Sequence, residues 1–388
     1  MNDLFLSKIV KWTKTTKYKL DDDFQSLFRV FNIAQAMNLC PKFLIYDKYI
    51  TNNAWFIHIL AISSFIVLVC LDSFFANFRL VLSEAMGPPF YGFSFYFISI
   101  LYENIGVIIQ ITMNGYLTKN NVLIITKLQD TFKDFRTTDY ITKSNRWTNW
   151  FIFFIYMNFI ANYSYFNFYV NTFSFHKFCF AFIKMCFDLN IVYTIFIFKM
   201  IGDSLTMFKD TAFCSKNMKL YEVSNRVYWN KMLRLYSNIL DVFELSKRTL
   251  NFFIFYFVSN ILLRILSHVQ LAILMNSINW LQHVAYSNIV MVLLTLAKEG
   301  IILIVLIAKC EKIYCVIGDV QTACQLALGN AACPEKRRFC KNVRRSSSAA
   351  FSKIYICNIL AVDAKLAVSL MSVTTTYTIV MLQAILIK

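Results

Sequence analysis

Seven long apolar stretches, separated by segments rich in lysine and arginine, limit what this chain can fold into. We place them at residues 54–71, 90–114, 147–170, 178–201, 250–274, 285–308 and 364–387. A helix needs roughly 20 apolar residues to cross a bilayer, and each stretch is about that long. The chain is 58% hydrophobic and only 16% charged, whereas soluble domains carry about 25% charged residues. We therefore predict an all-α membrane protein with seven transmembrane helices.

The distribution of lysine and arginine predicts the orientation in the membrane. Residues 1–53, 115–146, 202–249 and 310–363 together hold 30 of these side chains, against three in the segments on the other side. Basic loops are retained on the cytoplasmic face of a membrane. We therefore predict a cytoplasmic N-terminus, and an odd number of spans then places the C-terminus outside the cell.

This topology divides the chain into alternating membrane and cytoplasmic parts. They are a cytoplasmic N-terminal segment (1–53), helices one to four (54–201), a cytoplasmic helical extension (202–249), helices five and six (250–308), a cytoplasmic anchor segment (309–363) and the last helix (364–388). Residues 215–249 repeat apolar positions at helical spacing, which predicts an amphipathic continuation of span four. Residues 333–350 are basic and serine-rich, which predicts a flexible cytoplasmic loop, with phosphorylation at residues 346–348 as a further possibility.

Several classes of function are not supported by the sequence. It lacks a phosphate-binding glycine-rich loop, an H-E-x-x-H motif and a G-x-S-x-G motif, so we expect no enzyme. The 11 cysteines form no C-x-x-C pair, and we expect no metal site and no cofactor. The net charge of +17 is spread over the segments between the spans. We therefore expect contact with membrane lipids and no binding of nucleic acid.

Ionisable side chains within the spans are the informative exceptions to the apolar pattern. Such a group costs about 2.5–3.5 kcal/mol near the bilayer centre, so it usually faces protein or water. Lys184 and Asp188 are four residues apart and are predicted to pair along one helix face. Lys298 and Glu299 are adjacent, so they point apart and need other partners. The seven residues of this kind are Glu103, Lys184, Asp188, Arg264, His268, Lys298 and Glu299.

Two interpretations of these residues remain open. They could be structural ion pairs that hold the bundle together, or they could line a water-filled ligand cavity that opens to the outside. Tyrosines in the outer halves of the same spans would give such a cavity aromatic walls suited to small organic ligands. The candidate pocket residues are Tyr96, Glu103, Tyr163, Tyr165, Tyr169, Lys184, Asp188, Arg264 and His268.

The last span carries a polar stripe in an otherwise apolar helix. Thr376, Val380, Gln383 and Ile387 recur at helical spacing and share one face. A glutamine in a lipid-length helix is costly unless it faces protein or water. We therefore predict that this face lines a pore, with ordinary helix packing as the alternative.

The same helix resembles a known family. Thr376-Tyr377, five residues and then Gln383 resemble the Thr-Tyr-hydrophobic-Gln-Phe signature in the last helix of insect gustatory receptors, and Asp363 resembles the aspartate that precedes that helix. Ala384 stands where the family carries phenylalanine. That region is the pore constriction in the family, so we expect a wider constriction or one formed by a neighbouring aliphatic residue.

The resemblance implies a tastant-gated, non-selective cation channel in the plasma membrane of a sensory neuron. It implies four subunits around a central pore, as a homotetramer or as a heteromer with related receptors, and a shared cytoplasmic anchor domain. The pore and gate residues would be Thr376, Val380, Gln383, Ala384 and Ile387. The phenylalanine-rich outer spans favour bitter or other plant-derived ligands. The alternatives are a sugar-gated receptor, an odorant-type receptor of the same superfamily and, more remotely, a seven-span transporter.

Overall fold

The computed structural model describes residues 17–83, 94–135, 138–170, 175–214, 226–276, 282–330, 333–356 and 360–386. Almost all of this part of the chain is helical, which confirms the all-α class. A three-stranded antiparallel sheet of order β1-β3-β2 and a two-stranded pair β4-β5 are the exceptions. In chain order the elements are β1 (Tyr18–Lys19), α2 (Asp22–Met37), β2 (Leu44–Tyr46), β3 (Tyr49–Thr51), α3 (Trp55–Ser83), α4 (Ser94–Tyr116), α5 (Thr118–Phe135), α6 (Thr138–Val170), α7 (Phe175–Lys184), α8 (Cys186–Lys209), a π turn (Asp210–Cys214), α10 (Arg226–Asn276), α11 (Gln282–Asn330), α12 (Pro334–Ala350), β4 (Tyr355–Ile356), β5 (Leu360–Ala361) and α13 (Ala364–Leu386).

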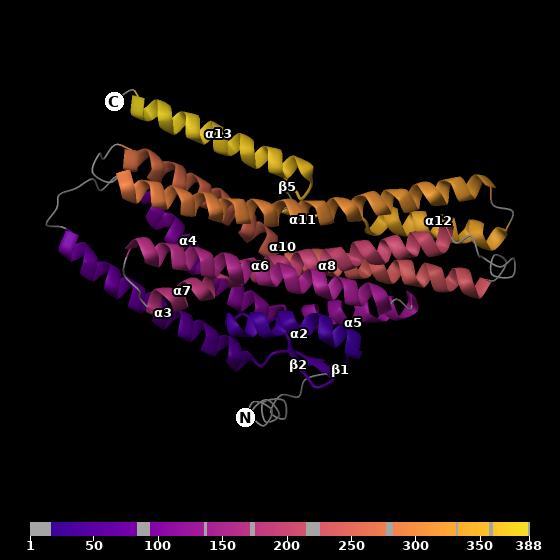
Figure 1. The fold of residues 1–388 in the computed structure, drawn as a ribbon. Coiled ribbons are helices and arrows are strands. Elements are labelled where there is room, and N and C mark those ends of the chain that lie inside the picture. Colours follow the sequence, from indigo (N-terminus) through magenta and orange to yellow (C-terminus); the bar gives the residue numbers. More distant parts are fainter. Residues whose placement is uncertain are drawn as a thin grey trace.

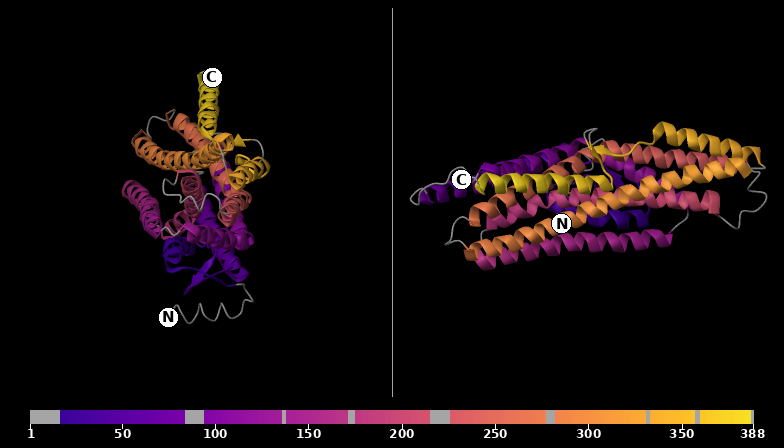
Figure 2. Two further views of the ribbon diagram at one scale, coloured as in Figure 1. Left: turned by 90° about the vertical axis from the view of Figure 1, so that its right-hand side faces the viewer. Right: turned by 90° about the horizontal axis from the view of Figure 1, so that it is seen from above.

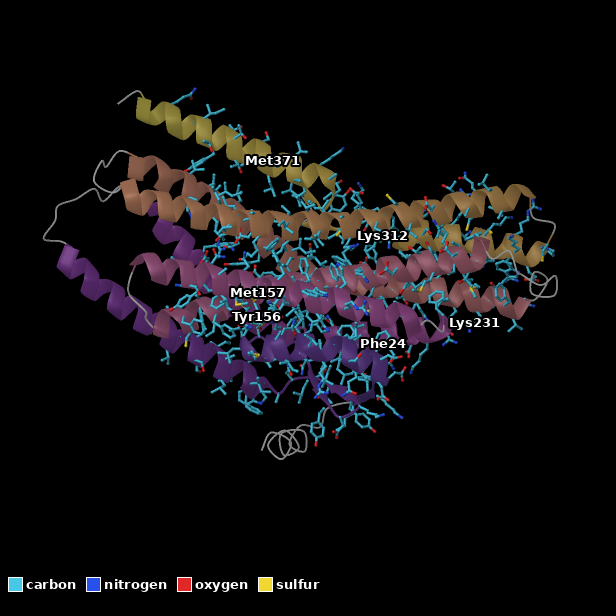
Figure 3. All side chains as sticks on the ribbon, in the orientation of Figure 1. Phe24, Tyr156, Met157, Lys231, Lys312 and Met371 are labelled. Atoms are coloured by element: carbon cyan, nitrogen blue, oxygen red, sulfur yellow. The ribbon has the colours of Figure 1, made fainter. Side chains whose placement is uncertain are left out.

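The helices form an elongated bundle and run roughly along its long axis (Figure 1). α8 lies in the middle, in contact with α10 and α11 and also with α2, α5 and α6. α13 begins next to β5 in contact with α10 and α11, and its far end projects from the bundle (Figures 1 and 2). Side chains fill the space between the bundle helices along their length, whereas Met371 of α13 lies outside this filled core (Figure 3).

The position of α8 follows from its sequence. A helix that is apolar around its whole circumference is stable only when it is surrounded. Every residue from Cys186 to Phe198 is buried. Phe196 packs against Phe28 and Phe31 of α2, with ring centroids 5.4 and 5.2 Å apart. α8 therefore ties the N-terminal segment to the rest of the bundle.

Within the described residues, two helical stretches are long and apolar enough to cross a membrane. They are Ala181–Phe213 and Arg226–Val269. Trp55–Val67 and Ala364–Val380 are apolar helical stretches too short for the same criterion. The seven-span topology and the orientation of the termini therefore remain predictions.

The predicted fourth span, residues 178–201, is two helices rather than one. α7 ends at Lys184 and α8 begins at Cys186, with a tight turn at Met185 whose N–H donates to the carbonyl of Phe182 at 3.1 Å. The break occurs without a proline. It separates Lys184 and Asp188 onto different helices, so the prediction that they pair along one helix face is wrong.

The amphipathic stretch predicted to continue span four is, in its described part, joined to span five instead. Span four continues through α8 to Lys209 and the π turn that ends at Cys214. From Arg226 onward, the amphipathic stretch is the first half of the 51-residue helix α10, which runs on into span five. Helical periodicity identified the helix correctly, but it could not say to which neighbouring apolar stretch the helix is joined.

The predicted flexible loop at 333–350 is a helix, α12. Pro334 begins it at a position where a proline costs no hydrogen bond. Phe339, Cys340 and Val343 are buried on one face, and the Phe339 ring lies 4.9 Å from that of Trp229. The hydroxyl of Ser347 lies 2.6 Å from that of Tyr236 and is buried. The basic composition hid this apolar face, and a phosphate on Ser347 would disrupt its packing.

The N-terminal segment is locked to the bundle by a buried loop after α2. Leu39 has a φ of 56°, a left-handed conformation that ends α2 and turns the chain inward. Lys42 is fully buried, and its Nζ donates to Asn114 Oδ1 at 2.7 Å and lies 3.7 Å from the centroid of the Phe253 ring. The loop therefore connects to α4 and α10 through the buried amine of Lys42.

Candidate functional site: an ion-paired cavity and an exposed last helix

A cluster of ion pairs joins four helices in the interior of the bundle. Glu103 of α4 accepts from Lys184 of α7 at 2.7 Å and from Nε of Arg264 of α10 at 2.6 Å. Arg264 also pairs, through Nη1, with Glu299 of α11. α4 can approach α10 this closely because Gly106 leaves room for the Tyr256 ring, where any side chain would collide. One guanidinium thus bridges two carboxylates from helices that are far apart in sequence.

A second pair completes the cluster. Lys298 Nζ of α11 donates to Asp188 Oδ2 of α8 at 2.7 Å. The expectation that Lys298 and Glu299 find separate partners is confirmed, since Glu299 pairs with Arg264 instead. The side chains of these two pairs, Arg264 with Glu299 and Lys298 with Asp188, are largely buried. Removing a single partner from such a pair leaves an uncompensated charge. The interpretation as structural ion pairs is therefore supported.

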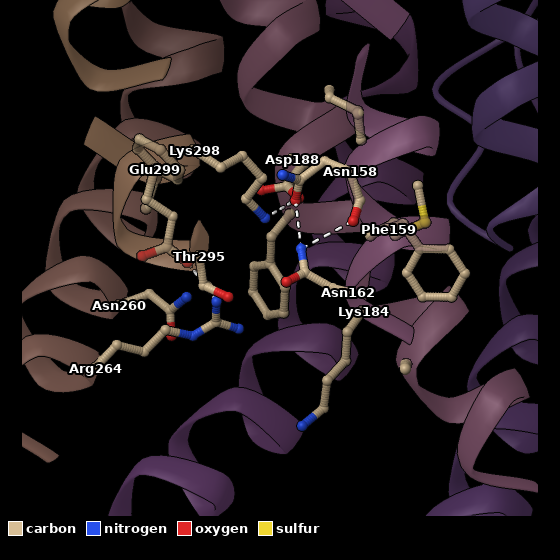
Figure 4. Close-up of a pocket in the computed structure, with 15 residues that line it drawn as sticks. Asn158, Phe159, Asn162, Lys184, Asp188, Asn260, Arg264, Thr295, Lys298 and Glu299 are labelled. Carbon is tan, nitrogen blue, oxygen red and sulfur yellow. Dashed lines mark hydrogen bonds and ion pairs between the residues drawn. The ribbon is translucent and has the colours of Figure 1, made fainter. Parts of the chain in front are cut away.

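Apart from Glu103, the same side chains border a cavity of about 230 Å³. Asp188 and Lys298 lie on one side of it, Arg264 and Asn260 on another, and Asn158 with Asn162 on a third (Figure 4). Helices α6, α7, α8 and α10 contribute to the wall together with α11. Its lining residues are Ile155, Asn158, Phe159, Asn162, Ala181, Lys184, Met185, Phe187, Asp188, Phe257, Asn260, Arg264, Thr295, Lys298 and Glu299. The two interpretations of the in-span charges are therefore compatible, because the ion pairs also form part of a cavity wall.

Of the candidate pocket residues, Lys184, Asp188 and Arg264 line the cavity. Glu103 is outside the lining and holds two of its cations in place. His268 and Tyr163 do not line it, and the Tyr163 ring packs 5.0 Å from that of Phe178. The side chains of Tyr96, Tyr165 and Tyr169 lie outside the described part of the structure.

Neutral polar residues of the wall were missed by the sequence analysis. Asn158, Asn162, Asn260 and Thr295 all line the cavity. Asn162 Nδ2 donates to Asn158 Oδ1 and to its backbone carbonyl, each at 2.8 Å. These residues interrupt apolar stretches just as the charged residues do. A search for every polar residue in the spans would have found them.

α13 contacts α10 and α11, but little of its described part is buried. Leu366 and Leu370 in its first two turns are buried against the core, but no residue described beyond Leu370 is. Met371 is 72% and Val380 54% exposed. Thr376 and Gln383 of the predicted pore stripe are exposed as well, while Tyr377 is half-buried. Ile387 and the side chain of Ala384 lie outside the described part of the structure.

The base of α13 is fixed by hydrogen bonds. Asp363 Oδ1 accepts from the backbone N–H of Lys365, and Glu311 of α11 accepts from that of Ala364, both at 3.0 Å. Asp363 Oδ2 pairs with Lys353 at 3.0 Å. Burial would raise the pKa of Asp363, but the bonds from Lys353 and from the backbone of Lys365 hold it below its ordinary value. Asp363 is therefore the N-cap of α13.

Replacing Asp363 with alanine is expected to lower the stability of the protein by about 1 kcal/mol, the usual cost of losing a cap. Asp363→Asn keeps a side-chain oxygen for the Lys365 N–H and is expected to lose less. Thermal unfolding of the purified protein in detergent measures both. Equal losses in the two variants would show that the ion pair to Lys353, and not the cap, holds this position.

The elongated helical bundle is similar in fold to an insect olfactory receptor. The solved structure of the insect olfactory receptor OR5 from Machilis hrabei, in complex with eugenol, superposes with a TM-score of 0.66. The match covers 94% of this chain and 100% of that one, at 11% sequence identity. No protein-family model matches the sequence, and neither does any curated protein. The likeness is thus one of fold, and the protein that shares it is a receptor rather than an enzyme.

Proposed function

We propose that this chain is one subunit of a ligand-gated cation channel of the insect chemoreceptor superfamily, and that it belongs to the gustatory branch. The observation that carries the proposal is the match of fold over nearly the whole of both chains. The Thr376-Tyr377…Gln383 signature, which resembles that of gustatory receptors, favours the branch. The protein would act in the plasma membrane, with its N-terminus in the cytoplasm.

The pore would form from α13 of four subunits. An apolar helix of this length with this many exposed side chains needs lipid, copies of itself, or both around it. The exposed Thr376 and Gln383 on the predicted stripe would then face an aqueous path, and the apolar residues of other faces would meet lipid. The inner halves of α10 and α11, with α12, would form the shared cytoplasmic anchor.

Gating requires a connection between the cavity and α13. α11 supplies one, because Lys298 and Glu299 border the cavity while Glu311 of the same helix holds the first turn of α13. Twelve residues of helix separate Glu299 from Glu311, or about 18 Å. α10 also touches both the cavity and α13. A ligand that binds the open arrangement more tightly than the closed one would shift the population through these two helices.

Two threonines of α13 test the pore assignment. Thr376 belongs to the predicted stripe, and Thr378 lies on the opposite face of the helix. We expect a charged, thiol-specific reagent to reduce ligand-evoked whole-cell current in Thr376→Cys and to leave Thr378→Cys and the unmodified channel unaffected. We also expect Gln383→Ala to change ion selectivity or conductance. Equal modification of both threonine variants, together with unchanged currents in Gln383→Ala, would remove α13 from the pore.

An odorant-type receptor is the second candidate, because a solved structure with this fold is an olfactory receptor bound to eugenol. A receptor of that type usually needs a co-receptor subunit. Calcium imaging of cells that express this chain alone, with a panel of sugars, alkaloids, glycosides and volatile phenols, distinguishes a gustatory from an odorant-type receptor. A response to a tastant without any co-receptor favours the gustatory receptor. Current that exceeds any saturable uptake would also exclude the remoter possibility of a transporter.

A further inference from the structure

We propose that Cys324 of α11 and Cys340 of α12 are a redox-sensitive pair, which hydrogen peroxide converts into a disulfide between the two helices. α12 lies near the end of the elongated bundle that is opposite to the C-terminal end of α13 (Figure 1). The inference goes beyond the proposed function and does not depend on it, because the chemistry needs no channel activity.

The two cysteines are brought together by the packing of consecutive helices. α12 follows α11 and packs against it. Cys324 lies six residues before the end of α11 at Asn330, and Cys340 lies six residues after the start of α12 at Pro334. Both side chains are buried and free, and the thiol of Cys324 donates a hydrogen bond to the sulfur of Cys340. Two sulfurs in hydrogen-bond contact can form a disulfide with little movement of the backbone.

Basic side chains of α12 flank the pair. Lys336 and Arg344 stand four residues before and after Cys340, so they lie on the same face of the helix. Lys336 acts electrostatically on Cys340 and Arg344 acts on Cys324, and in each case the positive charge favours the thiolate. Lys336 is half-buried and Arg344 is exposed, so solvent lies next to the side chains that flank the two sulfurs.

The two thiols are unequal, which assigns each a role. The hydrogen bond from Cys324 lowers the pKa of Cys340, and Lys336 lowers it further, although burial acts in the opposite direction. The same hydrogen bond raises the pKa of Cys324, and burial adds to this effect. A thiolate is the reactive form of cysteine, and redox-sensing cysteines are commonly found beside a second cysteine that resolves the first product. Cys340 is therefore the attacking thiol and Cys324 the resolving one.

The reaction takes place in two steps. The thiolate of Cys340 attacks one oxygen of the peroxide, the O–O bond breaks and hydroxide leaves, which gives a sulfenic acid on Cys340. The sulfur of Cys324 then attacks the sulfur of Cys340, an S–S bond forms and the S–OH bond breaks. The thiol proton of Cys324 leaves with that hydroxide as water. In total two thiols are oxidised to one disulfide, and one hydrogen peroxide is reduced to two waters.

The position of the pair fits a reversible modification. Both cysteines belong to the predicted cytoplasmic anchor segment, 309–363. The cytosol keeps thiols reduced, so a disulfide there is usually transient and reports the presence of an oxidant. The link would fasten α12 to α11, the helix that also holds the first turn of α13 through Glu311.

The test exposes the reduced, purified full-length protein in nanodiscs to hydrogen peroxide and maps the products by mass spectrometry after tryptic digestion without reductant. Residues 313–336 form one tryptic peptide, which contains Cys324, and Cys340 lies in the separate peptide 339–341. We expect the two peptides to become linked, and dithiothreitol to release them. The link is also expected to raise the unfolding temperature by a few degrees, because a disulfide restricts the unfolded chain.

Variants assign the link to its two sulfurs. The peptide 313–336 also contains Cys315 and Cys333, so the masses alone do not identify the cysteine that reacts. Cys324→Ala and Cys340→Ala are each expected to abolish the link and the rise in unfolding temperature. Cys315→Ala and Cys333→Ala are the matched controls and are expected to keep both.

The rate of the reaction tests the role of Cys340. Lys336→Met is expected to slow formation of the link several-fold, because it removes a cation that stabilises the thiolate of Cys340. Arg338→Met is the matched control, since Arg338 is an exposed cation of the same helix two residues from Cys340, on the opposite face. Equal rates in these two variants would show that Cys340 is not the attacking thiol.

Three results would overturn the redox pair. They are no link at a peroxide concentration that oxidises the exposed Cys315, a sulfinic acid on Cys340 without the link, and a link that survives in Cys340→Ala. If Cys340→Ala fails to fold, Cys324→Ala provides the same test. A protein that forms the link but gives no ligand-evoked current would refute the proposed channel and leave the redox pair standing.

Discussion

Replacing Arg264 with methionine is expected to lower the free energy of unfolding by about 3–5 kcal/mol, the cost of breaking a buried ion pair from one side. Arg264 is the cation shared by Glu103 and Glu299, which lie on α4 and α11. Methionine fills a similar volume, and Glu103 keeps its pair with Lys184, so the loss reports mainly the stranded carboxylate of Glu299 rather than a cavity. Thermal unfolding in detergent measures the change.

Two variants sharpen this result. Arg248→Met removes a cation that is 75% exposed from its pair with Glu244, and is expected to cost less than about 1 kcal/mol. The double variant Arg264→Met with Glu299→Met removes the stranded carboxylate of Glu299 and is expected to recover part of the loss. If Arg264→Met and Arg248→Met lower the free energy of unfolding equally, the ion pairs of Arg264 do not stabilise the bundle.

The stability of the protein is expected to rise from pH 7 to pH 9, and Lys42→Met is expected to abolish most of that rise. Burial lowers the pKa of Lys42 to about 7 from its ordinary value of 10.5, although the nearby Cys40 and Cys186 act in the opposite direction. Between these two values the unfolded chain binds a proton at Lys42 that the folded chain does not. Raising the pH therefore favours the folded state by up to about 1.4 kcal/mol per pH unit. Below pH 7 the amine is protonated in both states and the dependence on pH disappears.

Thermal unfolding at a series of pH values measures this slope. Lys48→Met is the matched control, because Lys48 is an exposed lysine of the same segment that pairs with Asp22. This variant is expected to keep the slope of the unmodified protein. A slope that survives in Lys42→Met would assign the pH dependence to other groups. The measurement bears on function, since the loop of Lys42 fastens the N-terminal segment to α4 and α10.

The sequence was sufficient to identify the charged residues that form the interior cluster. Glu103, Lys184, Asp188, Arg264, Lys298 and Glu299 stood out because each interrupts a long apolar stretch, and all six proved to be paired inside the bundle. The partners could not be predicted, because the pairs join residues 81, 161, 35 and 110 positions apart. Spacing along one helix suggested the wrong pair, Lys184 with Asp188.

The sequence by itself determined that the chain is helical and apolar, because hydrophobic length and periodicity are local properties. Only the tertiary structure decided which helices are continuous, that the basic segment of α12 has a buried face, and that three asparagines join the charged residues around one cavity. It also showed that the described side chains of α13 beyond Leu370 are exposed or only half-buried, which no pattern within that helix reveals. The physical reason is that side-chain partners are chosen between helices by packing and burial, whereas a sequence pattern describes one helix at a time.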